Sequence, residues 1–317
     1  MYYARFALLG LLVVWASASA QPFPSKQVRL ITPFPPGGSA DVIARITGQR
    51  LGEVLGQPVL VENRAGAGGV VGSDYVAKQP PDGHTLLLVT GAYPVSAVMM
   101  KALPFDPLND IAMVSLLTSY PFVISVAPGS PFKSLGELIA HAKANPGKLN
   151  YPSGGIGTVH HLSGELFNTL AGTDLTHIPY RGGNALLIET LAGRTDVLFE
   201  AITLSIGQIQ AGKLRPLAVT SKERWKALPD TPAVHETLPG YEVISFIGIG
   251  VTGGTPATIV HRLSRDLQKA LDADTVKRLV ELGGEPRASS PEEMRRFIQT
   301  EIDKWRSVVA QRNIERQ

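Results

Sequence analysis

The chain has 317 residues, of which 44% are hydrophobic and 18% are charged, and its formal net charge at pH 7 is +3. This composition is typical of a folded protein of about two domains and excludes a disordered chain. Such a small net charge argues against nucleic-acid binding. The sequence contains no cysteine, which excludes disulfides, thiolate metal sites and cysteine nucleophiles.

The first twenty residues have the pattern of a secretory signal. Arg5 precedes an uncharged apolar run over residues 6–15, and Ala18-Ser19-Ala20 supplies the small residues that a signal peptidase recognises. The apolar run is too short to cross about 30 Å of hydrocarbon as a helix. We therefore predict that residues 1–20 are a signal peptide, that cleavage follows Ala20 and that the exported chain starts at Gln21.

The exported chain then alternates strands and helices. Its first hundred residues predict strands over 28–32, 59–61 and 85–90, a helix over 39–55 and a short helix that ends at Lys78. Gly56 and Pro58 are typical of the end of a helix. The order strand, helix, strand, helix, strand indicates a parallel sheet covered by helices.

The middle of the chain repeats this alternation. The predicted strands cover 121–126, 149–153, 176–180, 196–201, 214–220 and 243–251, and the predicted helices cover 134–144, 158–170, 183–192 and 204–211. Three further helices are predicted over 256–271, 275–282 and 291 to about 311. The chain is therefore expected to form two α/β units, whose boundary the periodicity does not place.

Motifs of known enzymes and cofactor sites are incomplete in this sequence. Ser39 lacks the second glycine of a G-x-S-x-G nucleophile motif because Asp41 occupies that position. Val71 stands where a dinucleotide fingerprint starting at Gly66 needs its third glycine. His161 and Glu165 share a helix face, but no second histidine cluster supports a metal site. We expect no cofactor, no metal and no catalytic residues.

Four loops at strand-to-helix junctions are rich in glycine or small hydroxyl residues; they span 33–39, 90–94, 153–158 and 180–184. In an open α/β sheet such loops lie at the carboxyl ends of the strands, where ligands bind. The helix N-termini that follow carry unpaired amides that favour an anion, and glycine lets a ligand oxygen come close to them. The loops could be turns alone, but together they favour a binding site, most simply for a carboxylate.

Several blocks of the sequence, in order along the exported chain, resemble the solute receptors of tripartite tricarboxylate transporters, also called the Bug family of periplasmic binding proteins. The blocks are residues 33–45, 61–69, 81–86, 151–158 with His161-Leu162, 178–183 and 211–215. The resemblance implies a two-lobed α/β fold, with a mostly parallel sheet flanked by helices in each lobe and the ligand in the cleft between the lobes. The chain would cross between lobes near 121–126 and 245–251, so that lobe one comprises residues 21–122 and 246–317 and lobe two comprises residues 123–245.

The same resemblance implies a periplasmic receptor that closes on a small organic carboxylate and delivers it to membrane permease subunits. We expect it to act as a monomer. An exported hydrolase on a two-lobed scaffold and a sensor subunit that presents ligand to a signalling protein are the alternative functions. The sequence leaves open which carboxylate is bound.

The site residues implied by the resemblance come from both lobes. They are Pro35, Gly37, Gly38, Ser39, Asp41, Thr90 and Ala92 of lobe one, and Ser153, Gly154, Gly157, Thr158, His161, Arg181, Gly182, Gly183 and Glu200 of lobe two. Arg181 is the candidate charge partner for a carboxylate. Glu200 stands where the family commonly has Asp, an acid that can meet a polar or amino group of the ligand, and Phe246 opens a segment that commonly starts with Trp.

Overall fold

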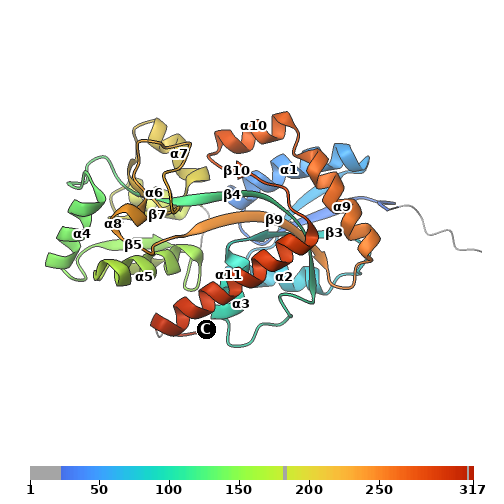
Figure 1. The fold of residues 1–317 in the computed structure, drawn as a ribbon, viewed down its shortest axis with the longest axis horizontal. Coiled ribbons are helices and arrows are strands. Elements are labelled where there is room, and N and C mark those ends of the chain that lie inside the picture. The colour runs from blue at the N-terminus through green and yellow to red at the C-terminus, as the bar shows by residue number, and fades with distance from the viewer. Residues whose placement is uncertain (1–22, 181–183, 313) are drawn as a thin grey trace, which may run out of the picture.

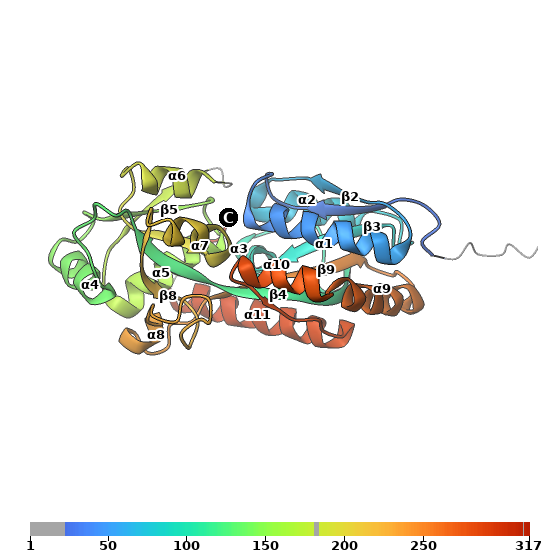
Figure 2. The same cartoon turned by 90° about the horizontal axis from the view of Figure 1, so that it is seen from above.

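A computed structural model describes residues 23–180, 184–312 and 314–317. Figures 1 and 2 show two lobes side by side along the longest axis, with two long strands running between them. These strands are β4 (Ile111–Val126) and β9 (Ile244–Thr252). The expected signal peptide lies outside the described residues. Within the described ranges, no helix combines the length and the apolar character needed to cross a membrane.

Lobe one is built on a mixed sheet in the order β10-β4-β9-β3-β1-β2. Its other strands are β1 (Val28–Thr32), β2 (Val59–Asn63), β3 (Thr85–Thr90) and β10 (Glu285–Pro286). β1 pairs in parallel with β2 and β3, whereas β9 runs antiparallel to both β3 and β4. The predicted mostly parallel sheet is therefore correct only for β1 to β3, because a chain that leaves the lobe along β4 must return along β9 in the opposite direction.

Helices cover both faces of this sheet, which explains why every residue of β3 is buried. The helices of lobe one are α1 (Ser39–Leu55), α2 (Val70–Ala77), α3 (Ala92–Met99), α9 (Ala257–Ala270), α10 (Ala273–Glu281) and α11 (Pro291–Arg312), with a 3₁₀ turn, η1, at Ala67–Gly69. Leu86 and Leu88 of β3 pack with α1, α9 and α10, and Leu87 and Val89 pack with α2, α3 and α11. This is the two-residue alternation of a strand between two helical layers.

Lobe two is formed around the far end of β4. Its strands are β5 (Asn150–Ser153), β6 (Thr176–Pro179), β7 (Leu198–Ala201) and β8 (Arg215–Val219), and its helices are α4 (Leu135–Ala144), α5 (Val159–Ala171), α6 (Ala185–Leu191), α7 (Ile202–Gln210) and α8 (Val234–Thr237). β7 and β8 pair antiparallel with β4, and β5 pairs in parallel with β6. Phe199 packs edge-on against Tyr151 and Phe167 in the core.

The chain passes between the lobes within single strands. β4 pairs with β9 as far as Pro121, opposite Ile244, and with β7 from Phe122, opposite Ala201. This change of partner lies next to the boundary that the sequence predicts at residue 122. The division of the chain at 122 and 245 stays a prediction.

Candidate functional site

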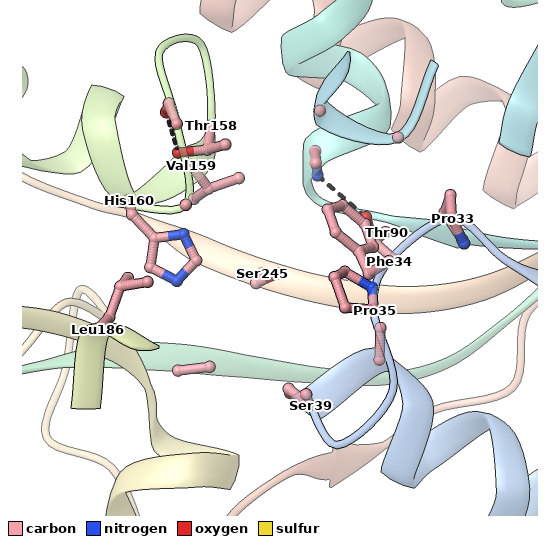
Figure 3. A pocket seen from close by; sticks show the side chains of 18 of the residues that line it. Pro33, Phe34, Pro35, Ser39, Thr90, Thr158, Val159, His160, Leu186 and Ser245 are labelled. Carbon is pink, nitrogen blue, oxygen red and sulfur yellow. Dashed lines mark hydrogen bonds between the residues drawn. The ribbon is translucent and has the colours of Figure 1, made fainter. Parts of the chain in front are cut away.

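A cavity of about 580 Å³ lies between the two lobes. Figure 3 shows Phe34, Pro35, Ser39 and Thr90 on one side and Thr158, Val159, His160 and Leu186 on the other, with Ser245 of β9 between them. The cavity is lined by Pro33, Phe34, Pro35, Gly38, Ser39, Ala40, residues 65–69, Thr90 and Ala92 of lobe one, by Gly154, Gly155, Ile156, Thr158, Val159, His160, Pro179, Leu186, Glu200, Ala201 and Leu204 of lobe two, and by Tyr120, Phe122, Ser245 and Gln317.

The N-termini of α1, α3, α5 and α7 meet at this cavity, because Ser39, Ala92, Val159 and Ala201 all line it. The first-turn amides of a helix have no partner within the helix and carry partial positive charge. The N-cap residues of α1 and α7 make no side-chain capping hydrogen bond. The cavity therefore favours a ligand group that accepts hydrogen bonds and carries negative charge.

Asp41 fixes the loop before α1 from behind the cavity wall. Its carboxylate accepts hydrogen bonds from the Gly37 amide at 3.0 Å, from Asn63 Nδ2 at 2.9 Å and from Arg45 Nε and Nη2 at 3.0 and 2.9 Å. Burial acts to raise the pKa of Asp41, but the hydrogen bonds from Arg45, Gly37 and Asn63 outweigh burial and hold the pKa below its usual value. Gly37 has a φ of +81°, a conformation that favours glycine. Asp41 and Gly37 thus shape the loop without lining the cavity.

The loop before α5 is held in a similar way. The Ser153 hydroxyl binds both the amide and the carbonyl of Gly155 at 3.0 Å, and it also binds His177 Nε2. The Gly157 amide donates to His161 Nδ1 at 3.2 Å, and the His161 ring stacks on His177 with centroids 4.2 Å apart. Burial lowers the pKa of His161, and burial together with His161 lowers the pKa of His177 to about 4. Both imidazoles are therefore neutral supports beneath the loop.

The structure divides the sixteen expected site residues into three groups. Those that line the cavity are Pro35, Gly38, Ser39, Thr90, Ala92, Gly154, Thr158 and Glu200. Gly37, Asp41, Ser153, Gly157 and His161 lie behind the wall and hold the loops through the bonds just described. Arg181, Gly182 and Gly183 lie outside the described residues. Contact of any of the sixteen with a ligand stays a prediction.

Sequence reasoning did not select Tyr120, Phe122, His160 or Ser245, all of which line the cavity. The first two and Ser245 come from the strands that join the lobes, so they face the cavity only because β4 and β9 run beneath it. Phe246, the residue that departs from the family pattern, is buried and packs against Phe297 on the far side of the sheet. That departure therefore does not alter the cavity wall.

His160 and Glu200 form a pair on the lobe-two side of the cavity. His160 Nε2 lies 3.2 Å from Glu200 Oε1, and the same oxygen accepts a hydrogen bond from the Ala201 amide at 2.8 Å. The Glu200 side chain is 3% exposed and that of His160 is 24% exposed. The edge of the imidazole meets the ring of Phe122 at a centroid distance of 5.1 Å.

The lobes touch each other on two sides of the cavity. The Ser39 hydroxyl of lobe one is hydrogen-bonded to the Thr203 hydroxyl of lobe two and lies 3.5 Å from the Tyr120 hydroxyl. On another side, a Cβ placed on Gly157 would lie 3.3 Å from Cβ of Met99 on α3. These contacts join the two lobes across the cavity. Side chains in the described ranges form no group of three metal-ligating residues that could hold an ion.

Two α/β lobes joined by crossing strands, with a cavity between them, define the class of periplasmic binding proteins. The model of the tripartite tricarboxylate transporter family receptor matches residues 43–314. The protein BugT of Bordetella pertussis is 35% identical over 311 residues, which cover 96% of this chain and 95% of BugT. The chain therefore belongs to the tripartite tricarboxylate transporter receptor family.

Solved structures share the whole fold. Rpa4515 of R. palustris, solved with adipate, is 34% identical with a TM-score of 0.89 and covers 93% of this chain and 100% of its own. The periplasmic binding protein BugD is 30% identical with a TM-score of 0.88 over 93% of this chain and 100% of its own. MatC of Rhodopseudomonas palustris, solved with malate, is 31% identical with a TM-score of 0.85 over 90% and 100%. This chain is accordingly a periplasmic solute-binding receptor and not an enzyme.

Proposed function

We propose that this receptor captures a small organic carboxylate in the cavity between its lobes. The observation that carries the proposal is the convergence of the N-termini of α1, α3, α5 and α7 on one cavity. Unpaired first-turn amides and the Ser39 and Thr90 hydroxyls are donors suited to carboxylate oxygens. The adipate and malate in the two related structures support the same chemistry.

In the part of the cavity wall that the structure describes, there is no Lys or Arg, so backbone amides carry the recognition in that part. Closure removes water from the cavity and lowers the local dielectric, which strengthens the attraction between fixed amide dipoles and a bound anion. Glycine at position 38 leaves room for a ligand oxygen beside the first amides of α1.

We further propose that the closed, loaded receptor delivers its ligand to membrane permease subunits of a tripartite tricarboxylate-type transporter. Residues 21–122 with 246–317 and residues 123–245 would be the two moving lobes of a monomer, exported with cleavage after Ala20. The family match supports delivery to a transporter. Co-purification of the ligand-loaded receptor with permease subunits tests delivery, and capture of a signalling protein instead would favour the sensor alternative.

The binding proposal is tested by identifying the ligand that the protein retains. Native mass spectrometry of freshly purified protein is expected to show a carboxylic acid that leaves on unfolding. The same acid at a hundredfold excess over its Kd should stabilise the folded state by about 2.7 kcal/mol, measured as a rise in melting temperature. The amide or methyl ester of that acid should give little shift, and an equal shift would refute recognition of the carboxylate. Turnover of the acid would instead favour the hydrolase alternative.

A further inference from the structure

The pair formed by His160 and Glu200 gives the cavity a group that can change its charge. Among the cavity-lining residues that the structure describes, the titratable side chains are His160, Glu200 and Tyr120. The Tyr120 hydroxyl stays neutral, because burial raises its pKa and the charge of Glu200 raises that pKa further. His160 is thus the side chain in this part of the wall that can become positive.

The two imidazole nitrogens of His160 have different surroundings. Glu200 Oε1 lies 3.2 Å from Nε2, and this geometry suits a hydrogen bond from Nε2–H to the carboxylate. Nδ1 makes no hydrogen bond to any side chain or backbone group in the described ranges. Figure 3 shows the ring of His160 directed from the start of α5 into the space between the lobes. Nδ1 is therefore the atom free to gain a proton and to meet a ligand.

Among the described residues around the cavity, the charges disfavour a second negative group on the ligand unless this proton is added. Glu200 is buried on β7 directly behind His160, and its carboxylate would repel a ligand carboxylate nearby. His161, next on α5, faces the other way and accepts from the Gly157 amide. Tyr120 of β4 is neutral, and the helix N-termini supply only partial positive charge. A proton on Nδ1 would offset the charge of Glu200 and provide a donor to the ligand.

We propose that His160 binds the second carboxylate of a dicarboxylate ligand and that capture adds one proton from solvent to Nδ1. The inference deepens the proposed function, on which it rests: the helix N-termini hold one carboxylate, and the imidazolium, backed by Glu200, holds the other. Glu200 then acts as a positioning residue that keeps Nε2 occupied. Monocarboxylates lack the second group, so their binding takes up no proton at His160.

The experiment is calorimetric titration of the full exported chain with pairs of straight-chain acids that differ by one carboxylate, such as adipate and hexanoate. Titrations at one pH in phosphate and in Tris separate proton uptake from the heat of binding, because the two buffers ionise with different enthalpies. We expect binding of adipate to take up close to one proton and binding of hexanoate to take up none. Adipate affinity, measured at about pH 6, 7 and 8, should fall as the pH rises, by at most about tenfold per pH unit for one proton taken up.

The decisive variant is His160→Gln, which keeps a hydrogen-bond donor but cannot become charged at these pH values. Its proton uptake with the diacid should disappear, and its diacid affinity at about pH 6 should fall at least about tenfold, while monoacid affinity stays within about threefold. His141→Gln, which removes an exposed histidine of α4, is the matched control and should behave as wild type. His160→Asn serves as the second variant if the first does not fold.

Each outcome has a defined meaning. Proton uptake that persists in the folded His160 variants, or wild-type diacid binding without uptake, overturns the proposal. If adipate does not bind, diacids of four to eight carbons and their matched monoacids are titrated in turn. Binding of monoacids alone refutes the role of His160 but leaves the proposed function standing. If none of these acids, nor the acid released from the purified protein, binds, the proposed function itself fails.

Discussion

Replacing Gly38 with valine tests whether the loop before α1 recognises the ligand through its backbone. Gly38 lines the cavity and is the N-cap residue of α1, and its φ of −83° and ψ of 169° are accessible to valine. A Cβ placed on Gly38 would meet only the Pro35 carbonyl oxygen within 4 Å, at 3.8 Å. The folded protein can therefore accept the side chain, which then occupies the space through which a ligand oxygen reaches the first amides of α1.

The size of the effect follows from the hydrogen bonds that valine would block. A hydrogen bond to a charged group contributes about 1.5–3 kcal/mol. Losing one or two such bonds reaches about 2.7 kcal/mol, or about a hundredfold in Kd, and we expect Gly38→Val to lose at least that much affinity. The fold should lose only about 1 kcal/mol, because glycine is a better N-cap than valine.

The assay is calorimetric affinity for the acid that the wild-type protein retains. Variants are compared only where their circular dichroism matches that of the parent. Gly129→Val is the matched control, because Gly129 is exposed and a Cβ there would have no neighbour within 4 Å. A folded Gly38→Val protein that binds as tightly as wild type would remove this loop from the site.

Three further predictions follow from the same geometry. Ser39→Ala should weaken binding by about 0.5–1.5 kcal/mol in calorimetry, since it removes one neutral hydroxyl that also bridges to Thr203 across the cleft; no change would exclude the hydroxyl from binding and closure. Ligand should reduce the radius of gyration in small-angle scattering as the lobes close, and equal radii with and without bound ligand would indicate a rigid pocket. Because the pKa of His177 is lowered to about 4, the unfolded state binds the proton first, so stability is complete above about pH 6.5 and decreases as the pH falls toward 4. Urea unfolding at about pH 7 and about pH 5 should differ by about 2 kcal/mol, and His177→Gln should reduce that difference.

Most helices and strands are predictable from the sequence because their signals are local. The spacing of Ile43, Ile46 and Leu51, for example, predicts α1, and its buried face packs on the sheet as expected. α3 is not predicted, because Pro94 after Tyr93 is typical of a loop. Pro94 in fact lies in the first turn of the helix, where a missing amide costs little. The first half of β4, α8 and β10 are also not predicted.

The candidate site is predictable where the signal is a glycine-rich loop and not where it depends on distant pairing. Gly38, Ser39 and Gly154 come from such loops and line the cavity, and their contact with a ligand stays a prediction. Tyr120 and Ser245 lie on the floor because β4 and β9 pair through a register that brings them opposite each other. The sequence around Tyr120 and Ser245 contains no local pattern from which this pairing register could be predicted.

His160 and His161 show that the residue at which a helix starts decides which side chain faces the cavity. α5 begins at Val159, after the N-cap Thr158, so His160 stands in the first turn on the cavity side. A rotation of about 100° per residue then turns His161 behind the loop, where it accepts from the Gly157 amide. The sequence places two histidines at a helix start, and the position of the N-cap decides which of them can meet a ligand.

The glycine-rich loops before α1 and α5 are held in the same way, and this explains their composition. In each loop, a polar side chain that does not line the cavity accepts a hydrogen bond from the backbone of its own loop. Asp41 accepts from the Gly37 amide, and Ser153 accepts from the Gly155 amide. The glycines leave the cavity side of each loop open, so the amides that remain unpaired are those that a ligand can reach. In the proposed function, such loops bind a carboxylate through their amides but do not distinguish the rest of the ligand. Selection among carboxylates would then depend on side chains elsewhere on the wall, and in its described part the ionisable pair is His160 and Glu200. This is why the pair rather than the loops is the place to test ligand identity.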